Sequence, residues 1–501
     1  MTSKDYQALM TRLEREHAVS PERYRAKTVF LALAGLSYPL ALCLLLGIAV
    51  IAVVQHAVGA TTPILLHPAL ALGLIALPLL YALVRVPLPA PGGRRLRRKE
   101  TAKLFALIDK VRTKSARIRI DGVRLTGEFE LRLHPTPRLG LFGYARNTLM
   151  LGLPLMQILS RKEFAALLAH EIEHASGSQG RTSAWIYRLR ETWRQSSQAV
   201  RTGNSSFLTR LAWWPLKSFI PYFEAFSFVM ARQNEYLADR LGGQVVGKRL
   251  MADALIAQAL GQRFLAEQFW PNFWAQAETQ PHPAFPPHGT LRTALAAGIT
   301  AERNEAWLNQ ALKQASSRDD TPPCLSDRLL ALDQFPEVPP RSTQSAAQAL
   351  LGRMLPELIK EFDSAWTKTE APHWEARHLA LTKAREVANI FAPCKFAELL
   401  AQDQYRYGMA LHTLGRTDEA RELFQLAADS PQGSAAAAIT LARLLRDTDA
   451  EAAHHYRELA IRQDARLANE AGAQADHAHH GFGSVESATV ARAALHPQQA
   501  A

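Results

Sequence analysis

A run of 27 residues without a formal charge, Thr28–Val54, is the feature that most limits how this chain can fold. A helix crosses a bilayer with about 20 apolar residues, so the run is long enough to span one. A second uncharged run, Thr61–Val84, contains three prolines, which membrane helices tolerate. Only Gln55–Ala60 separates the two runs. We therefore expect a transmembrane hairpin over residues 28–85, preceded by an N-terminal stub at residues 1–27.

A cleaved signal peptide and a buried hairpin of a soluble domain are the alternative interpretations of the first run. A signal peptide has an apolar core of about 7 to 15 residues, which this run exceeds, and a soluble core rarely hides so long an uncharged segment. Basic residues flank both outer ends of the hairpin, before Thr28 and after Val84. By the positive-inside rule we expect a multi-pass protein, of the inner membrane in a bacterium, with both termini and all that follows the hairpin in the cytoplasm.

The formal net charge of +12 raises the question of nucleic acid. The basic residues are spread along the chain, and their densest group lies directly after the hairpin, where such clusters set topology and contact anionic lipid. This group consists of Arg94, Arg95, Arg97, Arg98 and Lys99. We expect the lipid bilayer, and no nucleic acid, as a partner. The three cysteines form no CxxC pair, which argues against a disulfide framework.

The segment His170-Glu-Ile-Glu-His174 carries the strongest chemical signal. Ser160, followed three residues later by Glu163, forms a capping box that predicts a helix start. On that helix, residues four apart leave the same face, so His170 and His174 can bind one zinc ion with Glu171 beside them as catalytic base. By chance, such a pattern arises on the order of a few per cent of the time. The alternative is a surface helix with polar pairs.

A catalytic zinc site needs a third protein ligand. Glu235 lies 61 residues after His174, with Asp239 four residues further and on the same helical face. We expect Glu235 to complete the ligand set and Asp239 to orient a liganding histidine. Such a site holds one Zn²⁺ and lowers the pKa of a bound water toward about 7. Glu171 would take the proton as this water attacks a peptide carbonyl. Taken alone, the Glu235 segment would be an ordinary charged helix.

The motif at 170–174 followed by Glu235-Tyr-Leu-Ala-Asp239 resembles the membrane-bound HExxH zinc metallopeptidase family that includes the CAAX prenyl endoproteases and the heat-shock membrane protease HtpX. Phe142–Gly152 resembles that family's strand before the active-site helix. The resemblance covers roughly residues 100–335 and implies a zincin-like fold, one Zn²⁺ and polypeptide substrates that pair with a strand edge. We expect this edge at Asn147, Thr148, Leu149 and Met150.

The chain departs from the family at one position. The resemblance implies a His-Pro dipeptide before a late arginine, with that histidine helping to stabilise the oxyanion. Thr321–Arg328 matches this pattern, except that Pro322 stands in place of the histidine. Arg328 and His282, which begins an earlier His-Pro dipeptide, are the candidate oxyanion donors. For His282 the alternative is an exposed loop histidine.

Residues 205–230 are rich in Trp and Phe, and their charges recur every seven residues, at Arg210, Lys217 and Glu224. This spacing places the charges on one helical stripe, and we expect Pro215 and Pro221 to interrupt the helix. The segment either lies in the membrane interface beside the active site or forms a buried helix pair. A full third span would bring three charges into the bilayer.

Beyond the Pro-rich residues 336–340 the composition shifts to helix formers, so we expect a helical domain at residues 341–470. One set of residues there has the spacings of a tetratricopeptide repeat: Tyr407, Gly408, Leu411, Ala420, Phe424 and Pro431. Ala453 and Tyr456 suggest a degenerate second copy. The groove of such repeats would bind a protein partner, whereas the alternative is a stabilising helical cap. Residues 471–501, which include His477, His479 and His480, either bind a metal ion or form a disordered tail.

Together these features predict a mostly α protein with a small β-sheet (α+β). Its parts are the transmembrane hairpin, a zincin-like metallopeptidase domain at residues 86–340 and the helical repeat domain. We expect a membrane-anchored zinc endopeptidase that hydrolyses membrane or misfolded proteins in protein quality control. The alternative is a catalytically silent, peptidase-like scaffold that recruits partners through its repeats. CAAX processing is a narrower alternative, but those enzymes usually enclose their site with more spans than this chain offers.

Overall fold

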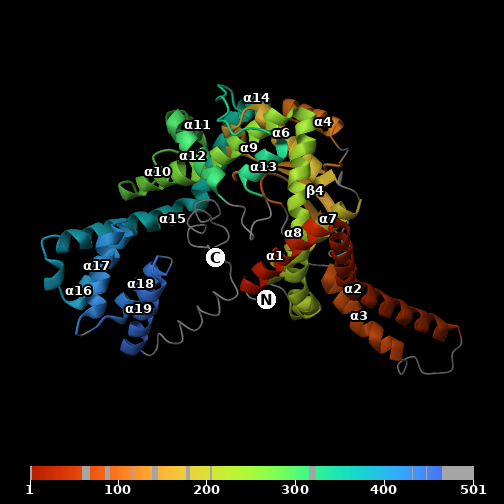
Figure 1. Cartoon of the computed structure of the whole chain (residues 1–501), viewed down its shortest axis with the longest axis horizontal. Coiled ribbons are helices and arrows are strands. Elements are labelled where there is room, and N and C mark those ends of the chain that lie inside the picture. Colours follow the sequence, from red (N-terminus) through yellow and green to blue (C-terminus); the bar gives the residue numbers. More distant parts are fainter. Residues whose placement is uncertain are drawn as a thin grey trace. The chain divides into compact units, whose positions relative to one another are not determined.

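The computed structural model describes residues 3–58, 68–84, 91–115, 118–137, 145–176, 181–202, 206–298, 300–314, 323–431, 433–446 and 448–464. Helices dominate and one small sheet accompanies them (Figure 1), in agreement with the expected fold class. The chain divides into two compact units. The first contains residues 3–265 and 291–359, and the second contains residues 266–290 and those from 360 onward. The domain boundaries expected from the sequence stay predictions.

The first unit begins with α1 (Ser3–Val19), α2 (Pro21–Ala57) and α3 (Pro68–Val84). Within the described ranges, α2 is the one helix that is both long and apolar enough to cross a membrane, and α3 is a shorter apolar helix of 17 residues. A Cβ atom added to Gly73 of α3 would meet the Cβ of Ala49, so the two helices approach closely there. The predicted linker starts within α2, which continues to Ala57; residues 59–67 lie outside the described part of the chain.

Helices α7 (Arg181–Thr202) and α8 (Phe207–Val246) share one hydrophobic core with α1, α2 and α3. The Tyr38 hydroxyl of α2 donates to the Ala212 carbonyl of α8 at 3.1 Å. The expected interruption at Pro215 and Pro221 is wrong, because α8 is one helix of 40 residues that contains both prolines. Each proline costs about 3 kcal/mol inside a helix. Burial of the opposite face of α8 in this core offsets that cost.

The sheet contains β1 (Arg94–Arg95), β2 (Gly122–Thr126), β3 (Leu131–Pro137) and β4 (Ala145–Gly152), in the order β1-β2-β4-β3. β4 runs parallel to β2 and antiparallel to β3. The strand expected at β4 is therefore present, but it has a neighbour on each side. β1 and β3 are the two edge strands, and the two prolines of β3 fit that position because proline cannot donate to a further strand.

The sheet and the core are completed by short helices. They are α4 (Ala102–Lys114), α5 (Leu153–Ile158), α6 (Arg161–Ser176), α9 (Lys248–Arg263), α11 (Pro287–Gly298), α12 (Ala301–Lys313), α13 (Leu325–Leu332) and α14 (Ala346–Leu351). The predicted capping box of α6 is confirmed: Ser160 N donates to Glu163 Oε2 at 2.6 Å, and Glu163 N donates to Ser160 Oγ at 3.2 Å. Since this box fixes the first turn, it also fixes which face of α6 its later residues occupy.

The second unit contains α10 (Trp270–Ala275), most of α15 (Leu355–Phe391), and four further helices. These are α16 (Ala401–Thr413), α17 (Thr417–Asp429), α18 (Ala435–Leu445) and α19 (Ala450–Gln463). They share one core, which includes the predicted repeat positions Tyr407, Leu411, Ala420, Phe424 and Tyr456. The repeat assignment itself stays a prediction, and the tail predicted at residues 471–501 lies outside the described part of the chain.

Candidate active site

Helix α6 brings His170, Glu171 and His174 to the centre of the first unit. Its apolar residues are fully or almost fully buried, among them Phe164, Leu167, Leu168 and Ile172. The helix packs on α8, α9 and the edge strand β3. Because this packing holds the backbone of α6, the two histidines, which are 8% and 9% exposed, project into the protein interior.

A close approach between α6 and α8 occurs at Gly242. A Cβ atom added there would lie 3.2 Å from His170 N and 3.4 Å from His170 Cα, and it would also meet the end of the Met251 side chain. Only a residue without a Cβ leaves the backbone of α8 this close to the first histidine. The same approach brings Glu235, two turns earlier in α8, to α6.

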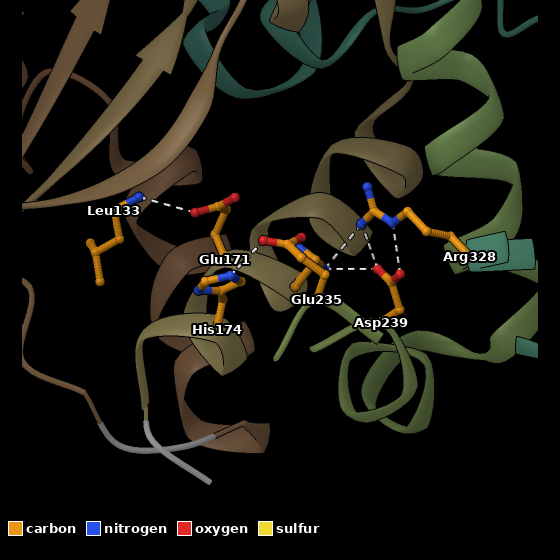
Figure 2. Close-up of polar contacts among 7 residues, drawn as sticks. Leu133, Glu171, His174, Glu235, Asp239 and Arg328 are labelled. Atoms are coloured by element: carbon orange, nitrogen blue, oxygen red, sulfur yellow. Dashed lines mark hydrogen bonds and ion pairs between the residues drawn. The ribbon is translucent and has the colours of Figure 1, made fainter. Parts of the chain in front are cut away.

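The carboxylate of Glu235 is close to both imidazoles, and Figure 2 shows its contact with His174. Its Oε1 is 2.7 Å from His174 Nε2 and its Oε2 is 3.5 Å from His170 Nε2. The structure thus brings together three side chains from two helices that are 61 residues apart in sequence. Two imidazole nitrogens and one carboxylate are a donor set that zinc commonly takes in catalytic sites.

Behind His170 lies an ion pair between Asp239 and Arg328. Asp239 Oδ1 is 2.8 Å from His170 Nδ1, on the side of the ring opposite Nε2. Arg328, from α13, donates to both carboxylate oxygens of Asp239, at 2.8 Å from Nε and 2.7 Å from Nη2 (Figure 2). A proton on Nδ1 that is held by Asp239 leaves the Nε2 lone pair free to bind a metal ion.

Glu171 faces the edge strand. The Leu133 backbone N–H of β3 donates to Glu171 Oε2 at 3.2 Å (Figure 2). Burial raises the pKa of the Glu171 carboxyl, although the two adjacent imidazoles act in the opposite direction. A carboxyl group whose pKa is raised is better placed to accept a proton and to release it again near neutral pH.

The charges around the histidines favour a cation. Burial alone would lower the pKa of His170, but the carboxylates of Asp239 and Glu235 outweigh it and raise the value to about 10. Burial likewise opposes ionisation of Glu235, yet the imidazoles hold the pKa of its carboxyl well below the usual range. A space that stabilises positive charge on buried imidazoles also suits a divalent ion.

The donor set fits zinc, although its atoms contact one another rather than a common point. Within the described ranges, no three His, Cys, Asp or Glu side chains already have the spacing of a metal site. Tetrahedral zinc with bonds of about 2.0–2.2 Å separates its ligand atoms by roughly 3.3–3.6 Å. The 2.7 Å contact between His174 and Glu235 would therefore open by less than about 1 Å.

Tyr187 was not identified from the sequence. It lies on α7, and its ring contacts that of His174 edge-on, with the ring centroids 4.6 Å apart. Burial raises the pKa of the Tyr187 phenol, and the carboxylates of Glu191, Glu171 and Glu235 raise it further. The phenol therefore keeps its proton beside the site. No sequence motif marks this residue, because only the folding of α7 brings it to His174.

Two further groups of residues were expected at the site. Asn147, Thr148, Leu149 and Met150 are in β4, where Thr148, Leu149 and Met150 are paired with both β2 and β3. The free edge expected there belongs to β3 instead, because β3 ends the strand order. His282 belongs to the second unit. Its side chain is 71% exposed and its Nδ1 is 3.7 Å from Glu375 Oε1. Pro322 lies outside the described residues.

The pair Gly242 and Gly243 offers a matched test of the close approach between α6 and α8. A Cβ atom at Gly243 would find its nearest neighbours at 3.5 to 3.7 Å, which is ordinary contact. Gly243→Ala is expected to leave stability unchanged or raise it by up to about 1 kcal/mol through helix propensity. Gly242→Ala is expected to lose about 1–3 kcal/mol through overpacking and to weaken zinc binding. Thermal unfolding and competitive zinc titration measure both effects, and equal behaviour of the two variants would contradict the close-approach argument.

No curated protein and no solved structure matches the chain. Residues 142–289 match the model of peptidase family M48. This segment includes α6, α7 and α8, and therefore His170, Glu171, His174, Glu235 and Asp239. The match supports membership of the M48 family of zinc metallopeptidases for the part of the chain that carries the site.

Proposed function

We propose that this chain is a membrane-anchored zinc endopeptidase. One observation carries the proposal: the Glu235 carboxylate of α8 lies within 3.5 Å of both imidazoles of α6, beside a half-buried glutamate that accepts a hydrogen bond from an edge strand. The match to peptidase family M48 over the same residues supports it independently.

His170, His174 and Glu235 would hold the zinc ion. Asp239 would orient His170 through Nδ1, and Arg328 would keep Asp239 ionised and in place, since it donates to both of its oxygens. In this arrangement Arg328 would hold Asp239 and would not contact the oxyanion. The Tyr187 phenol, which keeps its proton beside His174, is then the better placed oxyanion donor.

The bound metal would supply a Lewis acid that polarises the scissile carbonyl and acidifies water. Glu171 would take a proton from the attacking water and pass it to the leaving amine, which is the role of a general base that then becomes a general acid. Burial raises the pKa of its carboxyl and so favours the first half of this cycle, in which the carboxylate accepts the proton.

An extended substrate segment would pair with β3. Because Leu133 N–H points at Glu171 and away from β4, alternation along the strand also directs the backbone groups of Leu131 outward. Pro135, next on the same side, has no N–H to leave unpaired. Pairing of this kind grips the substrate backbone, so sequence preference would be loose. The strand edge that pairs with substrate is therefore proposed at Leu131–Pro135 and no longer at Asn147–Met150.

The membrane anchor would be the α2–α3 hairpin, with both termini and the catalytic region in the cytoplasm, as the flanking basic residues predict. In that location membrane or misfolded proteins are the accessible polypeptide substrates. The helical pairs α16–α17 and α18–α19 would bind a protein partner or a substrate segment.

Removal and return of the metal test the proposal. Full-length protein in detergent is expected to cleave casein, to stop after treatment with a zinc chelator, and to recover with about one equivalent of zinc per chain. Zinc-loaded Glu171→Gln protein, purified identically, excludes a contaminating protease. Cleavage that survives chelation would contradict the proposal. If the zinc-loaded wild type did not cleave casein, the scaffold alternative would be favoured.

A further inference from the structure

The first half of α8 exposes an apolar stripe that its core packing does not use. Phe207 is 80% exposed, Leu211 48%, Trp214 72% and Tyr222 41%. The first three residues are spaced by four and then three positions, which places them on one face of the helix. Trp213 and Phe223, on the opposite face, are buried against α2, α3 and α7. Aromatic side chains this exposed, in a row, mark a surface that contacts something other than water.

The contacts of α2 with α8 and α3 show which part of the hairpin lies beside this stripe. Ala212 of α8 is adjacent to Tyr38 of α2, and Gly73 of α3 is adjacent to Ala49. Gly73 lies eleven residues before Val84, and Tyr38 lies eleven residues before Ala49. Since α2 and α3 run antiparallel, the end of α3 at Val84 is therefore level with Tyr38. The exposed stripe of α8 runs from five residues before Ala212 to two residues after it, so it crosses that level.

This level coincides with one boundary of a membrane-sized segment. From Tyr38 to the end of α2 at Ala57 there are 20 residues, which rise about 30 Å, the thickness of a hydrocarbon core. Before Tyr38, α2 packs beside α8: Tyr24 donates to Phe226 O, and a Cβ atom on Gly35 would meet Phe219 and Trp193. The contacts of α2 with α8 at Tyr24, Gly35 and Tyr38 thus lie before this segment or at its first residue.

The charges on the stripe complement an anionic membrane surface. The sequence from Phe207 to Phe223 contains no acidic residue. Arg210 and Lys217, its two basic residues, are both exposed and lie near the apolar side chains. Aromatic rings with neighbouring Lys and Arg are the composition that prefers the boundary between headgroups and acyl chains.

We propose that the exposed stripe Phe207, Leu211 and Trp214, with Arg210 and Lys217, is a membrane-interface contact that lies in the headgroup region of the bilayer crossed by α2 and α3. This inference rests on the proposed membrane anchor. Glu235 follows Trp214 by 21 residues in the same helix, or about 32 Å along its axis. The contact would therefore limit how far above the bilayer the catalytic site lies, and would direct it to substrate segments outside the hydrocarbon core.

Depth-dependent quenching of single fluorescent labels tests this in the full-length protein reconstituted in anionic lipid nanodiscs. Three variants keep one cysteine each, with every other native cysteine replaced by serine. The first keeps native Cys43, which is exposed on α2. The second carries Trp214→Cys, and the third carries Arg240→Cys, an exposed position at the other end of α8. The lipids carry a nitroxide either near the headgroup or in the middle of the acyl chain.

We expect the Trp214→Cys label to lose fluorescence, more with the shallow nitroxide than with the deep one. The Cys43 label is expected to be quenched, and the Arg240→Cys label to be unquenched. Exchanging Arg210 and Lys217 for glutamine is expected to reduce quenching at Trp214→Cys in anionic discs. Stronger quenching by the deep nitroxide would make α8 a third span, and an unquenched but blue-shifted label would assign the stripe to a protein partner. Either result overturns the inference, whereas an unquenched Cys43 would overturn the membrane anchor itself.

Discussion

Glu171→Gln is expected to lower kcat/KM for casein by about 10²–10⁴ while zinc content stays at that of wild type. Glutamine has the same shape and can still accept the hydrogen bond from Leu133 N–H, so the local fold is retained. It cannot take a proton from water. Since His170, His174 and Glu235 are unchanged, metal binding is retained and the loss is confined to proton transfer.

Glu163→Gln is the matched control, because it makes the same exchange on the same helix. Glu163 closes the capping box with Ser160, and glutamine serves at that position equally well. Its activity and stability are expected to remain near wild type. If Glu171→Gln cleaved as fast as Glu163→Gln, the general base would have to be another group.

Arg328→Met is expected to lower the stability of the first unit by about 3–5 kcal/mol, because it leaves the carboxylate of Asp239 as a buried charge without its main partner. Asp239 is fully buried and Arg328 is 14% exposed. The guanidinium holds the pKa of Asp239 below its usual range against the opposing effect of burial. A loss of this size shifts Tm by on the order of 10 °C in a domain of this kind. Thermal unfolding in detergent measures it.

Two control variants test whether the loss of stability in Arg328→Met comes from the Asp239–Arg328 ion pair. Arg240 neighbours Asp239 in sequence but is exposed, so Arg240→Met is expected to change stability by no more than about 0.5 kcal/mol. The double variant Asp239→Asn with Arg328→Met removes the buried charge along with its partner, and we expect it to regain part of the loss. Equal stability of the Arg328→Met and Arg240→Met proteins would contradict the structural role of this ion pair.

The helices that carry the candidate site were predictable because their signals are local. A capping box, an i,i+4 pair of histidines and a second helix with Glu235 and Asp239 lie within short sequence windows. Their meeting at 2.7 Å depends on the close approach at Gly242, which nothing in the sequence around Gly242 identifies. The continuity of α8 was also missed, because helix propensity at Pro215 and Pro221 takes no account of the packing that offsets it.

The edge strand was assigned to the wrong segment for a related reason. The alternation of Thr148, Met150 and Gly152 with Leu149 and Leu151 permits a strand, but it carries no information on how many neighbours that strand has. Pro135 and Pro137 in β3 were the available signal, since prolines concentrate on edge strands. Tyr187 and the pairing of Arg328 with Asp239, 89 residues apart, had no comparable signal because both depend on tertiary folding alone.

Zinc X-ray absorption together with metal analysis of the full-length protein tests the central claim most directly. The account predicts one zinc per chain with nitrogen and oxygen ligands at about 2.0–2.2 Å, including two imidazoles and no sulfur. It also predicts that Glu235→Ala loses most of this zinc while keeping its fold. Full zinc occupancy in Glu235→Ala, or sulfur from one of the three cysteines in the wild-type ligand shell, would contradict the site described here.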